Sequence, residues 1–304
     1  MLSRLPFLLC LLLAPGLSAA QVTRSLPGFD LQRLQLESSG LGSLVVGTGR
    51  TLAPGDFRVS VEAHYEHMPL NFRRAWDPII TNDLSVVENK FTTHVTAAVG
   101  VLSWLQVGAQ VPFIVGQRGN PTRGVRPPDG QGLGTPWVSV RAAPWQMKNG
   151  APLNLGVELA AGLPVGREDL LGRDTYAVHP SLQLGLQGDN FQVGGELGAL
   201  LRPRHDLSPL SGREQDVLGN ELRLGLTVTA RGKNKTSTRP ELSLLMGVPL
   251  QGGRLGYEVL VGVRKHLVSG LDLYFLGGPG LGTSIDMPAV RLLAGASFTT
   301  GGDD

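Results

Sequence analysis

The chain has 304 residues, with 27 Lys and Arg against 25 Asp and Glu, which leaves a formal net charge of +2. Charged residues make up 17% and glycine contributes 42 residues, whereas soluble domains average roughly 25% charged residues and 7% glycine. A hydrophobic content of 41% argues against a disordered chain and a helical membrane bundle. The near-neutral balance argues against nucleic acid as a partner.

The first 20 residues have the three parts of a secretory signal peptide. Arg4 gives a basic start, residues 5–13 form an apolar run, and residues 18–20 are small and precede Gln21. The apolar run is too short to span a bilayer, so we expect residues 1–20 to be cleaved on export. Because Cys10 lies in this leader, the mature chain is expected to have no thiol and no cysteine-ligated metal.

Strict alternation of apolar residues with small or polar ones dominates the rest of the chain. A weak run covers residues 29–36, and stronger runs begin near Phe57, Phe91, Leu105 and Trp137. The pattern continues at residues 153–161, 181–187, 191–201 and 221–230, and near Leu242, Leu255, Leu271 and Val290. A period of two is typical of β-strands with one apolar face, so the sequence predicts an all-β fold.

The apolar face of such strands packs either against a second sheet or against lipid. Many of these runs reach ten or more residues, which suits a tilted strand that crosses a membrane better than a sandwich strand of five or six. The other face is mostly Gly, Ser, Thr and Gln with isolated charges, which suits a crowded barrel interior. Inward glycines would relieve crowding where the sheet curves. Three prolines, Pro112, Pro180 and Pro249, interrupt the runs and are expected at bulges or strand ends.

The connections alternate between short and long, as in outer-membrane barrels with short periplasmic turns and long extracellular loops. We therefore predict a closed antiparallel transmembrane β-barrel of about 14 strands, with both termini on the short-turn side. Twelve strands with an N-terminal plug is the alternative, because the first run is poorly patterned. Aromatic residues at the strand ends predict two interfacial belts, Phe57, Trp104, Trp145, Phe191 and Phe298 beside the short turns and Phe91, Phe113, Tyr176 and Tyr257 opposite.

Charged residues on the predicted inner face form the candidate site of the barrel. They could be a polar permeation path that selects solutes, or mutually neutralising pairs that fill a narrow lumen. Acids and bases are interspersed without a stripe of one sign, which favours the neutralising pairs. The lumen-lining candidates are Arg58, Glu62, His64, Glu66, His94, Arg141, Glu158, Glu196, Glu221, Arg223, Glu241, Glu258, Arg264, Asp272 and Arg291.

No pattern points to catalysis, to a cofactor or to a metal. His64 and His67 are spaced His-x-x-His, but residues three apart in a strand point to opposite faces, so they cannot share a metal there. No Gly-x-Ser-x-Gly elbow, zinc-protease motif or phosphate-binding loop occurs. The loop at residues 116–133 carries three arginines, Arg118, Arg123 and Arg126. It is expected to be a solvated basic loop, although it could bind lipopolysaccharide phosphates.

Several short segments of the sequence resemble the N-terminal barrel of OmpA-family proteins of myxobacterial type. They are residues 41–46, the segment Ala63-His64-Tyr65-Glu66-His67-Met68-Pro69-Leu70, Val86-Val87-Glu88, Val111-Pro112-Phe113 and Gln117-Arg118-Gly119. The resemblance covers about the first half of the chain and implies insertion into the outer membrane. A calcium-binding linker and a peptidoglycan-binding domain often follow in that family. This chain stops at residue 304, so we expect a barrel alone or the stub of a longer protein, and peptidoglycan binding is not carried over.

Together these observations predict a signal peptide at residues 1–20, a periplasmic first strand or plug at 21–43, the barrel at 44–300 and a tail at 301–304. The expected location is the outer membrane of a Gram-negative bacterium. The expected function is a non-enzymatic passive pore for small solutes. The alternative is a non-conducting anchor or interaction component of a larger envelope machine. Expected partners are outer-membrane lipid and lipopolysaccharide, together with periplasmic or surface proteins.

Overall fold

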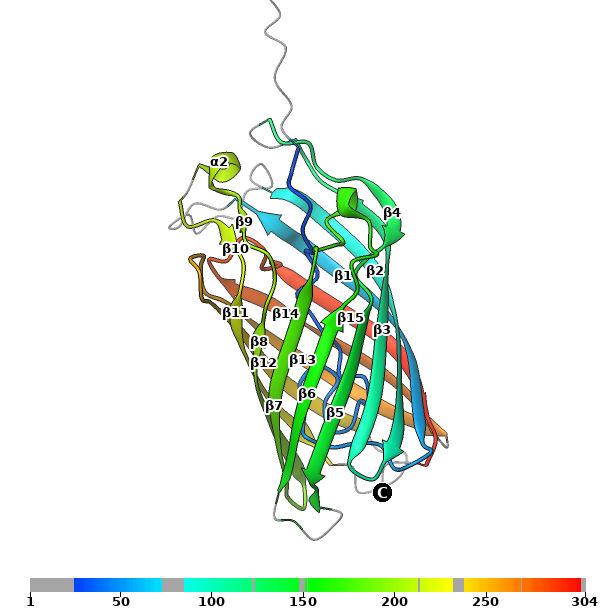
Figure 1. The fold of residues 1–304 in the computed structure, drawn as a ribbon. Coiled ribbons are helices and arrows are strands. Elements are labelled where there is room, and N and C mark those ends of the chain that lie inside the picture. The colour runs from blue at the N-terminus through cyan, green and yellow to red at the C-terminus, as the bar shows by residue number, and fades with distance from the viewer. Residues whose placement is uncertain are drawn as a thin grey trace, which may run out of the picture.

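A computed structural model describes residues 25–72, 85–121, 124–147, 151, 153–212, 214–231, 238–268 and 270–301. Twelve long antiparallel strands form one sheet, and β1 pairs with both β2 and β15, so the sheet closes into a barrel (Figure 1). These strands are β1 (Phe57–Asn71), β2 (Ser85–Leu102), β3 (Leu105–Arg118), β5 (Trp137–Trp145), β6 (Asn154–Gly162), β7 (Ala177–Gln187), β8 (Phe191–Leu200), β11 (Glu221–Ala230), β12 (Thr238–Pro249), β13 (Gly256–Val268), β14 (Leu271–Gly282) and β15 (Val290–Thr299).

The predicted closed antiparallel barrel is confirmed, and its strand count is that of the twelve-strand alternative rather than about fourteen. The weak run at residues 29–36 is not a strand, because Asp30 makes only an isolated bridge to Gly172. An extra short strand, β4 (Gly130–Leu133), extends the sheet from β3. The other short elements are η3 (Glu168–Leu170), β9 (His205–Asp206), α2 (Ser208–Ser211) and β10 (Val217–Leu218).

Alternation along each strand separates an apolar outside from a polar inside. In β1, Val61 is 51% exposed while its neighbour Glu62 is 2% exposed. Most of the aromatic residues predicted for the two interfacial belts are exposed on the outside, including Trp104 and Trp145 at the short-turn end and Phe113 at the other end. In hydrocarbon every backbone N–H and C=O group needs a hydrogen-bond partner, and a sheet without free edges provides one for each strand. The closed sheet and its apolar outer surface together meet the requirements of a barrel that spans a membrane.

None of the helices in the described residues is long and apolar enough to cross a membrane.

Pro249 lies at a strand end, as predicted, whereas Pro112 and Pro180 lie inside β3 and β7, each paired with the neighbouring strand on one side only. Pro180 is in β7, and the β7–β8 ladder runs only from Ser181 to Gln187 before a single bridge at Val178. Pro112 lies beyond Gln110, the last residue of β3 that pairs with β5. Pro249 is the final residue of β12. A residue without an N–H cannot donate to the neighbouring strand, which explains these positions.

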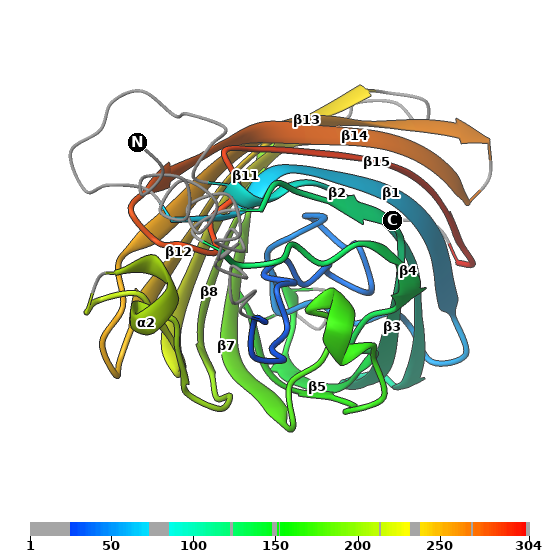
Figure 2. The ribbon, with the colours of Figure 1, turned by 90° about the horizontal axis from the view of Figure 1, so that it is seen from above.

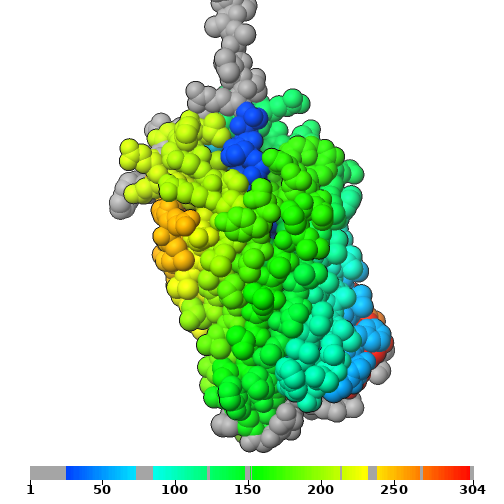
Figure 3. All heavy atoms as spheres, viewed as in Figure 1, coloured from blue at the N-terminus to red at the C-terminus, as the bar shows by residue number. Residues whose placement is uncertain are grey.

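Residues 25–56, here called the plug, run through the inside of the barrel and then continue into β1 (Figure 2). The first plug residues lie at the long-loop end, where the N–H of Leu31 donates to the carbonyl of Leu171 at 2.9 Å (Figure 3). At the short-turn end the N–H of Gly55 donates to Gly100. The expectation that both ends of the chain lie on the short-turn side is therefore wrong for the N-terminal end of the described residues.

An apolar cluster surrounds the plug where it enters the barrel. Phe29 and Leu31 are completely or almost completely buried there, at 0% and 1% exposure. Their partners in the cluster come from the ends of β1 and β2 and from four long loops, and they are Leu70, Phe72, Val86, Val87, Val125, Leu171, Leu207, Leu218 and Ile285. Burial of large apolar side chains from so many segments joins the plug and the loops into one small core at the long-loop mouth.

Candidate functional site: the plugged lumen

All fifteen charged candidates lie on the inner face of the barrel, in the positions that the alternation predicts. Eleven are less than 9% exposed: Arg58, Glu62, His64, Glu66, His94, Arg141, Glu221, Glu241, Glu258, Arg264 and Arg291. Four are half-buried: Glu158, Glu196, Arg223 and Asp272. His67 lies on the other face of β1 from His64, and among the described residues no cluster of three or more His, Cys, Asp and Glu could hold a metal ion.

The side of the lumen formed by β1, β2 and β15, here called the dry side, contains a closely packed charge network. Arg291 of β15 lies 2.9 Å from Glu66 and 2.8 Å from Glu258, and its guanidinium is 2.7 Å from His64. Lys90 of β2 lies 3.8 Å from Glu66. We did not predict this buried lysine, although Lys90 falls on the inward positions of its strand.

The side formed by β6, β7, β8 and β11, here called the wet side, carries three of the four half-buried candidates; the fourth, Asp272 of β14, lies beside the turn between β13 and β14. The side chains of Glu158, Glu196 and Arg223 are 15%, 18% and 15% exposed, against 1% for Glu66 and Arg291. Arg141 links this side to the plug, since its guanidinium is ion-paired with Glu158 and lies 2.5 Å from Glu37. Because these charged side chains are partly exposed, water can reach into this side of the lumen.

The plug is held at the long-loop mouth by ion pairs that the sequence pattern did not predict. Arg33 of the plug lies 2.8 Å from Asp286 and 3.2 Å from Glu221, and Arg202 also pairs with Asp286 at 3.3 Å. Burial alone would raise the pKa of Asp286, but the two guanidinium groups hold it below its ordinary value. Arg33, Arg202 and Asp286 lie in irregular segments, where no periodicity shows which side chains face inward.

Deeper in the lumen, charged side chains of the wall bind the backbone of the plug. Glu241 accepts hydrogen bonds from the N–H of Leu44 at 3.1 Å and from the hydroxyl of Ser43. In the opposite sense, Arg58 donates to the carbonyl of Ser38 at 3.1 Å, and Arg264 donates to the carbonyl of Gly40 at 2.6 Å. These wall groups replace the partners that a helix or a strand would give the irregular backbone of the plug.

The apolar side chains of the plug pack towards β13, β14 and β15. Leu34, Leu44, Val45 and Val46 form a buried cluster with Leu260, Tyr274, Leu276 and Leu293. Contact of this kind excludes water between these side chains, although Leu34, Val45 and Val46 also line a cavity. The plug therefore faces two kinds of wall. Its apolar side chains pack towards β13–β15, and the partly exposed charges of the wall lie towards β6–β11.

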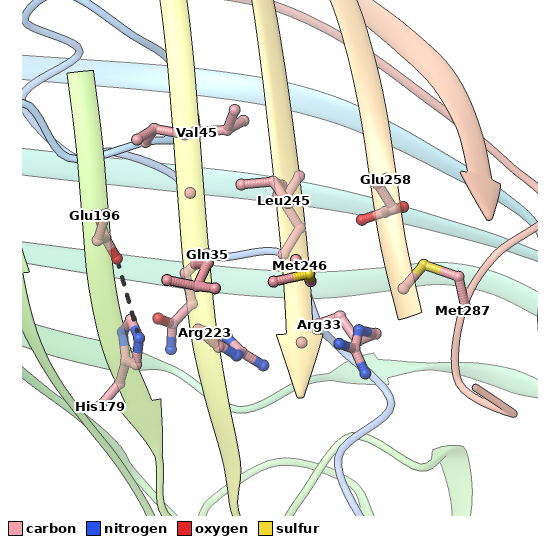
Figure 4. Close-up of a pocket in the computed structure, with 15 residues that line it drawn as sticks. Arg33, Gln35, Val45, His179, Glu196, Arg223, Leu245, Met246, Glu258 and Met287 are labelled. Atoms are coloured by element: carbon pink, nitrogen blue, oxygen red, sulfur yellow. Dashed lines mark ion pairs between the residues drawn. The ribbon is translucent and has the colours of Figure 1, made fainter. Parts of the chain in front are cut away.

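A cavity of about 690 Å³ lies at the outer end of the plug, beside Ser25 and Gly28, and two more cavities lie beside the plug within the barrel. The long-loop cavity, of about 70 Å³, lies between the plug and β7, β8, β11, β12 and β13, and charges of both signs line it (Figure 4). Its charged lining residues are Arg33, Glu196, Arg223 and Glu258, with His179 lying 4.0 Å from Glu196. The short-turn cavity, of about 490 Å³, is lined by residues that include Arg50, Asn154, Gln187 and Arg231. Each has room for several water molecules.

Comparison with known proteins identifies the fold. No family model matches the chain, and no curated protein matches it in sequence. The crystal structure of the COG4313 outer membrane channel from Pseudomonas putida F1 is similar, with a TM-score of 0.61 and 16% sequence identity, over 82% of this chain and 97% of that one. A NanC porin structure gives a TM-score of 0.51 and 11% identity, over 79% and 98%. This chain therefore has the fold of an outer-membrane β-barrel.

Proposed function

We propose that the protein is a channel in the outer membrane of a Gram-negative bacterium, through which small polar solutes or ions pass down their gradients. The observation that carries this proposal is the pair of cavities beside the plug, one nearer each end of the barrel, each lined in part by charged side chains. A barrel with a purely structural role does not require partly exposed charges such as Glu196 and Arg223 in its interior. The outer-membrane channel and the porin that share the fold support the same function.

Single-channel recording in planar bilayers tests this function. We expect the refolded wild-type protein to conduct ions, and Arg223→Gln to change its conductance or its preference for anions over cations, because Arg223 lines the long-loop cavity. Arg167→Gln is the matched control, since that arginine lies in an exposed loop and pairs with Asp169. An identical change in both variants would contradict a path along Arg223.

The location and orientation can be tested separately by single-cysteine labelling, because Cys10 is the only cysteine of the chain. Both Ser25 and Gly55 are exposed, the first at the long-loop end and the second at the short-turn end. With long loops outside the cell, we expect a membrane-impermeant maleimide to label Ser25→Cys on intact cells and Gly55→Cys only after permeabilisation. The reverse pattern would invert the orientation, and labelling of neither on intact cells would contradict surface exposure.

A non-conducting anchor for a larger envelope machine is the second candidate. The interlocked buried charges of the dry side and the many contacts of the plug favour it, since both make a closed, rigid barrel. The resemblance to OmpA-family barrels stays a prediction and would agree with this role, as would contacts of the long loops with lipopolysaccharide or with surface proteins. No conductance from a folded barrel, together with crosslinked envelope partners, would favour the anchor over the channel.

A further inference from the structure

The two cavities are separated along the wet side by a very short piece of the plug. Val46 lines the long-loop cavity and Arg50 lines the short-turn cavity, so only residues 47–49 lie between them along the plug. These three residues, Gly47, Thr48 and Gly49, are here called the gate segment. The N–H of Gly47 donates to Glu196 at 2.8 Å, which places the segment against the wall at the end of the long-loop cavity.

Two glycines of the wall face the gate segment. A Cβ atom on Gly185 of β7 would lie 2.3 Å from the carbonyl oxygen of Thr48. A Cβ atom on Gly194 of β8 would lie 2.8 Å from the side-chain Cγ2 of Thr48. Real Cβ atoms do not approach other atoms so closely, so any larger residue would push the segment off the wall. The two glycines let the plug touch the barrel here.

The gate segment differs from the anchored parts of the plug in what holds it. Arg33 and Glu37 are tied to the wall by buried ion pairs, whereas Thr48 uses its hydroxyl on the carbonyl of Leu41, within the plug itself. Gly49 has a φ of +69°, a backbone conformation that glycine adopts without strain. A shift of these three residues would break the hydrogen bond of Gly47 to Glu196 but not the ion pairs of Arg33 and Glu37.

We propose that the gate segment is the permeation barrier of the channel, and that the solute path runs along the wet side, between the plug and β7 and β8. The inference rests on the proposed channel function and deepens it by locating the path. The permeant class is water and small ions, since charges of both signs line the long-loop cavity and its volume is about 70 Å³. The plug stays in the barrel while its gate segment moves.

A disulfide that ties the gate segment to the wall tests this proposal. A Cβ on Gly194 would lie 3.6 Å from the Cβ of Thr48, a separation that disulfides adopt, and the mature chain is expected to have no other cysteine. We expect the oxidised double variant Thr48→Cys with Gly194→Cys to lose most of the single-channel conductance and to regain it on reduction. The two single variants are the matched controls and should not respond to oxidation.

A widening variant completes the test. Thr48→Gly removes the side chain that rests on Gly194, so we expect higher conductance than in the wild type. Full conductance of the oxidised double variant, or failure of the two thiols to pair in the folded barrel, would overturn the gate. If the wild type conducts and oxidation has no effect, the channel function stands and only the gate falls. If neither the wild type nor Thr48→Gly conducts while folded, both fall together.

Discussion

The dry and wet sides of the lumen are built from the same residue types, yet they differ in access to water. On the dry side, Glu66, Lys90 and Arg291 are each 1% exposed and contact one another or their neighbours directly. On the wet side, Glu158, Glu196 and Arg223 keep 15 to 18% of their side chains exposed. The difference arises from the plug, which packs apolar side chains towards β13–β15, while the partly exposed charges lie towards β6–β11. Charged residues inside a barrel therefore indicate a permeation path only where water also reaches those residues.

The largest effect should come from removing a cation on the dry side. Arg291→Met leaves the buried carboxylates of Glu66 and Glu258 without their shared partner, so we expect the free energy of unfolding to fall by about 3–5 kcal/mol. Arg223→Met is the matched wet-side variant and should cost only about 1 kcal/mol, because Arg33 still pairs with the remaining Glu221 and Arg223 itself is partly exposed. Denaturant unfolding in detergent measures both, and equal losses would remove the distinction between the two sides.

A pH effect of intermediate size is expected from Asp30, at the long-loop mouth. Burial raises the pKa of Asp30 from 3.8 to about 6, against the lowering influence of Lys90. Between these two pKa values the unfolded chain has released the proton of Asp30 and the folded chain has not. The contribution of Asp30 to stability is therefore full below pH 3.8 and is lost as the pH rises to about 6, by ~3 kcal/mol.

Unfolding of the wild type and Asp30→Asn at several pH values measures this contribution. The asparagine variant should lack the decline between pH 4 and pH 6, a range set by the two pKa values of Asp30. The same decline of stability with pH in both proteins would show that Asp30 is solvated. The dry side would then not extend to the long-loop mouth.

The smallest effect on stability is expected at the wall beside the gate segment, where a glycine facing the plug can be compared with one facing outward. Gly185→Ala places a Cβ against the backbone of Thr48, so we expect a loss of about 1–3 kcal/mol in the free energy of unfolding. Gly195→Ala in β8 is the control, because its Cβ would meet only Leu226 at 3.6 Å, an ordinary contact, and should change stability by less than about 0.5 kcal/mol. Equal effects would mean that the plug does not rest on this part of the wall.

The inner face of the barrel could be predicted because a strand repeats every two residues. Once Val61 is placed outside, Glu62 must be inside, and the same logic assigned Arg291 and the other charged candidates. Arg33, Glu37 and Asp286 escaped prediction because they lie in irregular segments, where neighbouring side chains have no fixed directions. The inward glycines were predicted to relieve curvature. Gly185 and Gly194 instead make room for the plug, which a strand pattern does not reveal.

The sequence by itself determined that the chain forms long strands with one apolar face, because alternation is a local property of the backbone. Only the tertiary structure decided that residues 25–56 pass through the closed barrel, and which charges remain in water. That outcome depends on contacts between residues far apart in the chain, such as Arg33 with Asp286 and Gly47 with Glu196. Local pattern determines the strands of the barrel, and long-range packing of the plug then determines which half of its interior water can reach.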